Sequence, residues 1–376
     1  MTDLKGANVA IWYVNGDGGN NSITGDSVAN AWDTVQYAFD KIADGTVNDG
    51  DEIRICKTGA DATHYAIGTA LNPAWDNKEV TITGANASGL VDNTQVTLTA
   101  TASITAIIDI GATKCERMVW ANLHFDGDDT STYCVNSAVN NHYQKWLNCR
   151  FSQATSHGMK KLGNYWDFIN CRFDNNGGDG ARLDATSFDT YYKCLFDNNA
   201  AAGVDTVTEN AFRHKWFECV FYNNGAGGGD LNGAGGVIVN CTFDSNGEHG
   251  LEDRGSSIQT FRSGNIYSNN TLAGVNYWTN TDSIAFNELF YNNRHDTEDT
   301  SANADGIGEL GHIINYTPHH ANNNPEYADA ANFDFTPKAS FMGVDKGVPT
   351  PYKWYGSTAD DVGLGKLNNE ESISIF

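Results

Sequence analysis

A short phrase that recurs through the middle of the chain constrains its fold more than any other feature. In five copies a cysteine is followed two residues later by a phenylalanine: Cys149/Phe151, Cys171/Phe173, Cys194/Phe196, Cys219/Phe221 and Cys241/Phe243. Looser copies place aromatic residues at Phe125 before them and at Tyr267 and Phe290 after them, so the aromatic position returns every 22 to 26 residues. A period of that size is typical of a stacked array in which each unit contacts its neighbours.

Each repeat contains short apolar or β-branched runs, such as WDFI at residues 166–169 and VIVNC at residues 237–241, broken by Gly and Asn. Runs this short favour strands over helices. The turn phrase after each aromatic residue contains an asparagine at Asn176, Asn199, Asn224, Asn246, Asn270 and Asn293. Asparagine and glycine tolerate the backbone of a sharp corner. A second strand then opens on a glycine, as at Gly180.

These features predict an all-β fold, a parallel β-helix with coils of about 23 residues. Leucine-rich repeats have a similar period, but they need a Leu-rich consensus and a helical arc, and neither is present. Stacked coils about 4.8 Å apart place like residues over one another. We therefore expect columns of aromatic, Cys and Asn side chains. The Asn amides could line a sugar groove, but we expect them to bond to one another and to the corner backbone.

The ends of the chain differ from its repeats. Residues 31–42 carry apolar positions at helical spacing after Asn30, so we expect a helix there, capped by Asn30 and covering the open end of the solenoid. The domain prediction is residues 1–50 as an N-terminal strand, loop and capping helix, residues 51–320 as the β-helix, and residues 321–376 as an irregular tail that packs on it. Residues 294–305 are polar and patternless and are expected to form a loop.

Charge, hydropathy and cysteine content limit the kinds of partner and bound metal that this chain is expected to have. The formal net charge of −24 argues against nucleic acid, which calls for basic patches. No apolar run reaches membrane-spanning length, and no signal peptide is visible at the start. The eight cysteines contain no CxxC pair, so a zinc site is disfavoured. Neighbouring coils bring Cα atoms within disulfide range, but we expect buried free thiols that act as small apolar side chains.

Several stretches resemble the pectate-lyase-like superfamily of right-handed parallel β-helices. They are WYVNG at residues 12–16 with AWDTVQYA at residues 31–38, ITGAN at residues 82–86, and the segment from Asp334-Phe335 to residues 345–347. The resemblance covers nearly the whole chain and implies a right-handed β-helix. The superfamily contains lyases, hydrolases, epimerases, phage tailspikes and adhesins, so the resemblance implies no single activity.

Candidate site residues lie on the strand after each Asn corner. The outward positions there are expected at Lys160, Arg182, Asp205, Asn232, Glu252 and Asn276. Beside them lie Asp184, Asp253, Arg254, Tyr277 and Trp278. We expect a glycan to contact Arg182, Asp184, Asn276, Tyr277 and Trp278, with the two aromatic residues serving as a stacking platform.

Two chemistries use these residues. Glycoside hydrolysis needs two carboxylates. Asp205 and Glu252 are expected two rungs apart, close to the carboxylate separation of inverting glycosidases. Asp184 and Asp205 are expected one rung apart, close to the separation of retaining glycosidases. An acidic sheet also yields such pairs without catalysis. Lyase chemistry is implied by the resemblance, with a calcium cluster and a basic residue, and Glu252, Asp253 and Arg254 are its best local match, with His249 nearby. The superfamily's catalytic phrases are absent.

Two sequence features bear on metal binding. GGDG at residues 177–180 resembles a calcium-roll motif, but that motif needs Asp two residues later, where this chain has Arg182, and its period differs. The surface pair His319 and His320 could bind a metal, although such pairs usually do not. We therefore predict no metal ligands and no cofactor, with Ca²⁺ as the one alternative left open.

The sequence thus predicts an extracellular or virion-associated structural β-helix protein, such as a phage tail, spike or head-decoration component. We expect it to attach to other virion or surface proteins, to polysaccharide, or to both. No nucleic-acid or membrane partner is expected, and the resemblance implies a homotrimer as its oligomeric form. The alternative is a polysaccharide lyase or glycoside hydrolase that acts on a surface polysaccharide.

Overall fold

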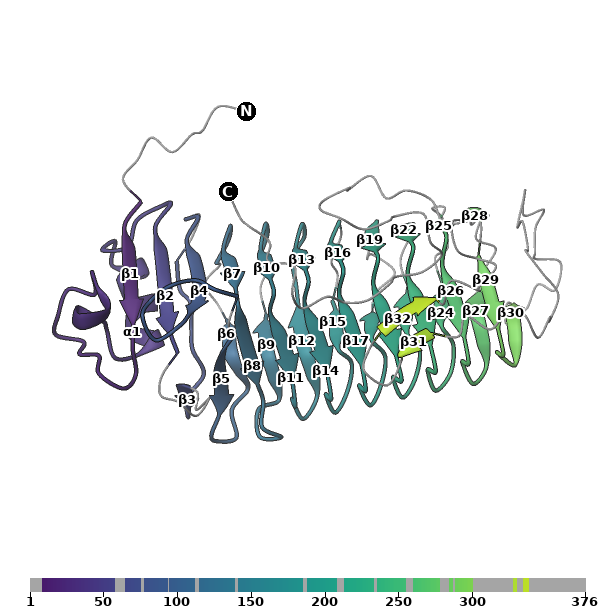
Figure 1. Cartoon of the computed structure of the whole chain (residues 1–376), viewed down its shortest axis with the longest axis horizontal. Helices are drawn as coiled ribbons and strands as arrows, with labels where there is room; N and C mark the ends of the chain where they lie inside the picture. The colour runs from purple at the N-terminus through teal and green to yellow at the C-terminus, as the bar shows by residue number, and fades with distance from the viewer. Residues whose placement is uncertain are drawn as a thin grey trace, which may run out of the picture. The chain divides into compact units, whose positions relative to one another are not determined.

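A computed structural model describes most of the repeat region. The described residues are 9–57, 65–75, 78–93, 95–111, 115–138, 141–184, 188–207, 213–232, 235–254, 260–277, 284–286, 288–299, 327–329 and 334–337. The chain divides into two compact units, residues 1–172 and residues 173–376. In both units, short strands stack in parallel along three sheets, here named A, B and C (Figure 1).

The first unit begins with β1, which pairs with β2 although 37 residues separate them, from Val14 to Glu52. Its sheet A contains β1 Ile11–Val14, β2 Glu52–Cys56, β4 Thr81–Ala85, β7 Val119–Ala121, β10 Lys145–Leu147 and β13 Asp167–Ile169. Its sheet B contains β3 Tyr65–Ile67, β5 Val96–Ala100, β8 Leu123–Asp126 and β11 Arg150–Ser152. Its sheet C contains β6 Ala106–Ile110, β9 Tyr133–Ser137 and β12 His157–Lys161.

The second unit repeats this order of strands along its coils. Its sheet A contains β16 Thr190–Tyr192, β19 His214–Phe217, β22 Gly236–Val239, β25 Phe261–Ser263 and β28 Ile284–Phe286. Its sheet B contains β17 Leu195–Asp197, β20 Val220–Tyr222, β23 Thr242–Asp244, β26 Ile266–Ser268 and β29 Leu289–Tyr291. Its sheet C contains β15 Ala181–Leu183, β18 Val204–Thr206, β21 Gly229–Leu231, β24 Leu251–Asp253, β27 Ala273–Tyr277 and β30 His295–Asp299. The boundary between the units falls within β14 (Arg172–Asp174).

The corner from sheet A to sheet B explains the repeated phrase. The residue before each cysteine has a left-handed backbone, with φ of 53° at Lys193, 51° at Glu218 and 53° at Asn240. The cysteine therefore sits at a corner, just before the sheet B strand, rather than within a continuous strand as the sequence runs imply. All eight cysteines are buried free thiols.

The aromatic column is confirmed in both units. In the second unit the rings of Phe196 and Phe221 stack with centroids 4.9 Å apart, and those of Phe221 and Phe243 with centroids 4.6 Å apart. Phe173 stacks on Phe196 at 4.8 Å. In the first unit Phe125 is the equivalent residue, stacked on Phe151 at 5.4 Å. These side chains are fully buried and form the core.

The asparagine column is also confirmed as structural. The amide of Asn199 donates to Asn224 Oδ1 at 2.9 Å and to the carbonyl of Phe173 at 3.0 Å. The amide of Asn224 repeats both contacts one rung further, to Asn246 Oδ1 and to the carbonyl of Phe196, each at 3.0 Å. Each buried amide thus satisfies a buried carbonyl at the corner.

The N-terminal helix begins later than its apolar spacing predicts. Helix α1 spans Val35–Ala43, and its N-cap is Thr34, whose hydroxyl accepts from the Tyr37 amide at 3.2 Å. The expected start at residue 31 is wrong because Trp32 is extended and bridges to Val14 beside β1. A separate 3₁₀ turn spans Val28–Asn30. The lid itself is confirmed, since Phe39 of α1 packs edge-on against Trp75 and Trp120 in the core of the first unit.

Two features concern the C-terminal part. Residues 295–299, expected to lie in a loop, form β30, which pairs in parallel with β27. A polar segment can form a strand in this way because the pairing uses backbone groups.

In the expected tail, β31 Tyr327–Asp329 and β32 Asp334–Pro337 form an antiparallel pair. Among the described residues, no helix has the length and apolar character needed to cross a membrane.

Candidate functional site

The outward face of sheet C in the second unit carries a row of polar side chains, one on each of five successive rungs. Its members, in register order, are Arg182, Asp205, Asp230, Glu252 and Asn276. The residues that flank them along each strand, such as Val204 and Leu251, are buried in the core. Strand alternation therefore turns the row away from the core. We call these five residues the sheet C row.

The row passes from an open end to a covered end. The side chain of Arg182 is 34% exposed, whereas the side chains of Asp230 and Glu252 are 12% and 9% exposed, and Asn276 is buried. A ligand that reaches Asp230 therefore approaches from the side of Arg182 and Asp205.

Arg254, just beyond β24, ties two carboxylates of the row together. Its Nη2 atom lies 3.1 Å from Asp230 Oδ2. Its Nε atom donates to Glu252 Oε2 at 2.9 Å, and Nη2 contacts the same oxygen. A guanidinium shared by two acids offsets the repulsion expected between carboxylates on neighbouring rungs, about 4.8 Å apart.

Asp230 has the most perturbed carboxyl group of the row. Burial raises the pKa of Asp230 to about 8, Arg254 opposes the rise, and the charges of Glu252 and Asp205 add to it. At neutral pH the group is therefore largely protonated and can donate a proton or a hydrogen bond.

His249 and Asn276 hold Glu252 from its other side. The backbone amide of Ala273 donates to His249 Nδ1 at 3.3 Å, which leaves Nε2 to face Glu252 Oε1 at 3.5 Å. The amide nitrogen of Asn276 lies 3.4 Å from the same oxygen and 3.2 Å from His249 Nε2. Glu252 is thus fixed in position by three neighbouring side chains: Arg254, His249 and Asn276.

The structure brings some of the predicted site residues together and separates others. Asp205 and Glu252 lie two rungs apart on one face, with Asp230 between them. Asp253 is fully buried and its Oδ1 accepts from the Thr260 hydroxyl at 3.3 Å, so it does not share that face. Asp184 lies 3.5 Å from Arg182 in an ion pair.

Two expected relationships change with the observed register. Asp205 faces Arg182 on the preceding rung, not Asp184, so its nearest carboxylate on a neighbouring strand is that of Asp230. The row position expected at Asn232 belongs to Asp230, because β21 begins at Gly229 and Asn232 lies beyond it. The signal was present in the sequence: Leu231 follows Asp230 as Leu183 follows Arg182, and both leucines face the core.

Other candidates lie outside what the structure describes. The Tyr277 backbone pairs with Asp253, but its side chain is outside the described set, as are Trp278, His319 and His320. Within the described residues no cluster of three or more His, Cys, Asp or Glu side chains is placed to hold a metal ion. In the expected calcium-roll phrase, Asp179 Oδ1 accepts from the Ala202 amide at 3.0 Å. Lys160, the row candidate of the first unit, lies with its Nζ atom 5.8 Å from the ring centre of Tyr133.

Comparison with solved structures places this architecture. The chain is similar to the pectate lyase Pel9A, with 13% identity and a TM-score of 0.59 over 94% of this chain and 95% of that one. It is also similar to an ORF18 protein of Geobacillus virus E2 (15% identity, TM-score 0.45, 77% of this chain and 60% of that one). A third similar structure is tailspike protein 2 of an Escherichia coli O157:H7 bacteriophage (12% identity, TM-score 0.45, 68% of this chain and 35% of that one).

No family model and no curated protein matches the sequence. At 13% identity the likeness to the lyase shows the fold alone. The chain is a right-handed parallel β-helix of the pectate-lyase-like fold. Its function has to be argued from the sheet C row.

Proposed function

We propose that the protein is an extracellular or virion-associated β-helix that attaches to a polysaccharide through the sheet C row. The observation that carries the proposal is the regular succession of Arg182, Asp205, Asp230 and Glu252, one hydrogen-bonding side chain per rung. An extended polymer lying along the sheet axis meets such groups at a constant interval of about 4.8 Å. Rigid strands hold the side chains in place, so little ordering is needed on binding.

The charge of the protein narrows the glycan class. With a formal net charge of −24 and carboxylates in the row, the surface repels strongly anionic polymers at low salt. A glycan that is neutral or basic fits better. Association with other virion or surface proteins and assembly as a homotrimer belong to the same proposal, as does location on a virion or outside the cell.

A second function, glycoside hydrolysis, is favoured by one specific observation. Asp230 combines a pKa raised to about 8 with carboxylates on both neighbouring rungs, Asp205 and Glu252. A protonated acid beside an ionised carboxylate at about 5 Å is the arrangement of a retaining glycosidase. In that reaction Asp230 would protonate the leaving oxygen, and Asp205, on the open side, would attack the anomeric carbon. Lyase chemistry is less well supported, because Arg254, its expected base, is paired with Asp230 and Glu252.

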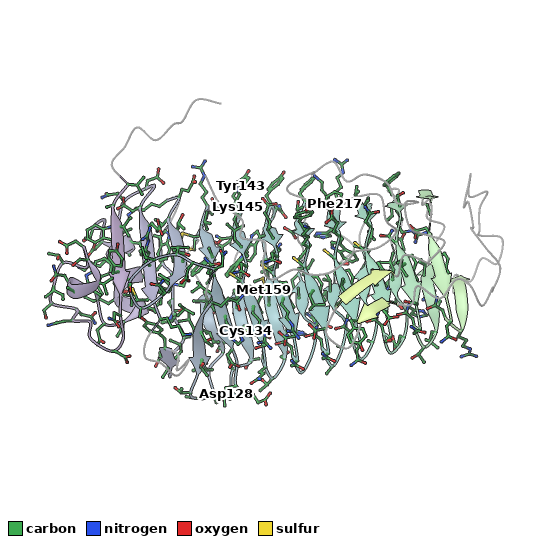
Figure 2. The ribbon with its side chains drawn as sticks, viewed as in Figure 1. Asp128, Cys134, Tyr143, Lys145, Met159 and Phe217 are labelled. Carbon is green, nitrogen blue, oxygen red and sulfur yellow. The ribbon has the colours of Figure 1, made fainter. Side chains whose placement is uncertain are left out.

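Binding to a panel of neutral, acidic and basic polysaccharides tests both functions. Attachment predicts retention of at least one glycan without release of reducing ends or unsaturated products. We expect Asp205→Asn and Glu252→Gln to weaken that retention about tenfold or more, each residue being at a well-formed polar contact. The matched control is Asp128→Asn on an exposed turn of the first unit (Figure 2), which should bind as the parent does.

The outcomes separate the two functions. Reducing ends that appear with the parent and vanish in Asp230→Asn establish hydrolysis in place of attachment alone. Retention of no polysaccharide in the panel, by a protein with the parent's circular dichroism spectrum, refutes glycan attachment.

A further inference from the structure

A cavity of about 540 Å³ lies beside the N-terminal helix of the first unit. Three segments line it: the loop after β1 at Gly16 and Asp17, the start of α1 with the two residues before it, and β3 with the residues just after it. Binding sites for small molecules have volumes of about 300–1,000 Å³, so the cavity is large enough to hold one. All of its lining residues belong to the first unit and none to the sheet C row.

The walls of this cavity are held in place by packing and hydrogen bonds. Val35 of α1, Ile67 of β3 and Leu71 form its apolar side, and all three are buried. The Tyr65 hydroxyl accepts from the Gly16 amide at 3.2 Å and donates to a carbonyl at the end of β2 at 2.9 Å. These bonds join the loop, β2 and β3, so few groups would have to become ordered when a ligand binds.

Two carboxylates line the cavity without a cation beside them. The backbone amides of Asp17 and Asp33 donate to Asn15 Oδ1 at 3.2 Å and to Asn21 Oδ1 at 2.9 Å, which fixes the backbone at both positions. In the part of the chain that the structure describes, neither carboxylate has a hydrogen bond or an ion pair, and the lining contains no Lys, Arg or His. Burial is the largest cause of the raised pKa of Tyr65, and the nearby charges of Asp17 and Asp33 add to it.

We propose that this cavity binds an organic cation, a primary ammonium or guanidinium group carried on an aliphatic chain. The charged group pairs with Asp17 and Asp33, and the chain lies along Val35, Ile67 and Leu71. Hydrogen bonds between a cation and a carboxylate are stronger than those between neutral groups, and the apolar side takes the methylene groups out of water. The formal net charge of −24 attracts cations to the protein and repels anions.

This chemistry has two sources. One is a free alkylamine, and the other is a lysine or arginine side chain of a partner protein, which also combines an aliphatic stem with a charged end. A neutral sugar matches the cavity less well, because it would leave both carboxylates without a positive partner. The inference does not depend on glycan attachment, since the cavity and the sheet C row share no residue.

Ligand-observed NMR titrations of the whole protein compare ligands that are matched in shape and differ in charge. Pentylamine is paired with 1-pentanol, and Nα-acetyl-lysine amide with Nα-acetyl-norleucine amide. We expect the cation of at least one pair to bind about tenfold more tightly than its neutral counterpart, with an affinity that falls as salt is added. Asp17→Asn and Asp33→Asn should each weaken cation binding about threefold. The double variant should lose the preference for the cation, whereas Asp128→Asn should bind as the parent does.

The outcomes separate the sources and test the site. Binding of the lysine amide supports a protein side chain as the natural ligand, and binding of pentylamine alone supports a free amine. Equal binding of cation and neutral counterpart refutes the proposal, as does a preference for the cation that survives in the double variant. Binding of neither cation at up to about 10 mM also refutes it. The double variant should retain polysaccharide as the parent does, so failure here leaves glycan attachment standing.

Discussion

Arg254 links neighbouring rungs of sheet C by contacting both Asp230, 3.1 Å from its Nη2 atom, and Glu252, 2.9 Å from its Nε atom. The link matters because Asp230 keeps a raised pKa even with a guanidinium beside it. Burial of the carboxyl therefore outweighs the attraction of the charge, and the protonated form is the dominant one at neutral pH.

The raised pKa of Asp230 predicts how stability depends on pH. Its carboxyl group titrates near 3.8 in the unfolded chain and near 8 in the folded one. Between these values the folded state binds a proton that the unfolded state has lost, so stability falls as pH rises through this window. The Asp230→Asn variant cannot ionise at this position. Its free energy of unfolding, relative to that of the parent, should therefore rise by on the order of a few kcal/mol between pH 4 and pH 8.

Urea unfolding at a series of pH values measures this difference. The exposed Asp128→Asn serves as the control, and its curve should run parallel to that of the parent. If the Asp230→Asn and parent curves are also parallel from pH 4 to 8, the folded pKa of Asp230 is not raised.

Replacement of one buried asparagine of the column by alanine should lower the free energy of unfolding. Asn224→Ala removes the donor to Asn246 Oδ1 and to the Phe196 carbonyl, and the acceptor of the Asn199 amide. Because the remaining groups stay buried, we expect a loss of about 2–5 kcal/mol in the free energy of unfolding. The neighbouring Asn223 is exposed and left-handed, with φ of 52°.

Asn223→Gly is therefore the matched control, since glycine adopts that backbone freely and the change should cost less than about 1 kcal/mol. Denaturant unfolding followed by circular dichroism compares the two variants. Equal losses at the two positions would contradict a structural role specific to the buried column.

The aromatic column predicts a large cavity effect. Phe221 is fully buried between Phe196 and Phe243, with centroid distances of 4.9 and 4.6 Å. Phe221→Ala should cost about 3–5 kcal/mol. Phe261, which is 36% exposed on sheet A, provides the comparison, and Phe261→Ala should cost less than about 1 kcal/mol. The shift of the thermal midpoint checks both, and a small shift for Phe221→Ala would argue that the rings do not pack as a column.

The thiols should be inert in the folded protein. Burial raises the pKa values of Cys115, Cys149 and Cys219 well above the usual range, and all eight cysteines are buried. The thiolate is the reactive form, so a thiol reagent at neutral pH should leave the native protein unlabelled. After unfolding in urea all eight should react, as mass spectrometry would count. Rapid labelling before unfolding would show that the coils open.

The repeat made much of the architecture predictable. Residues such as Asn199 and Asn224 recur at one period and must stack once the chain coils, so their mutual hydrogen bonds follow from spacing alone. The same holds for the rings of Phe196 and Phe221.

The site was less predictable, because register depends on where each strand begins. A run of three glycines precedes Asp230, and glycine gives no periodic signal, so the row position appeared to fall two residues later, at Asn232. The helix start failed for a related reason. Trp32 has helical spacing to Val35, but its backbone is occupied by hydrogen bonds to residues 13 and 15. The pKa of Asp230 depends on three-dimensional burial, which no local pattern encodes.

The recurrence of identical amide contacts from Asn176 to Asn293 has an evolutionary consequence. Asn199 Oδ1 now accepts a hydrogen bond from the side-chain amide of Asn176. Excision of residues 199–223 would place Asn224 at that position, where it could accept the same hydrogen bond. Genes for such a chain can gain or lose whole turns by duplication or deletion without inventing new packing. The length of the β-helix would then change during evolution in steps of one coil.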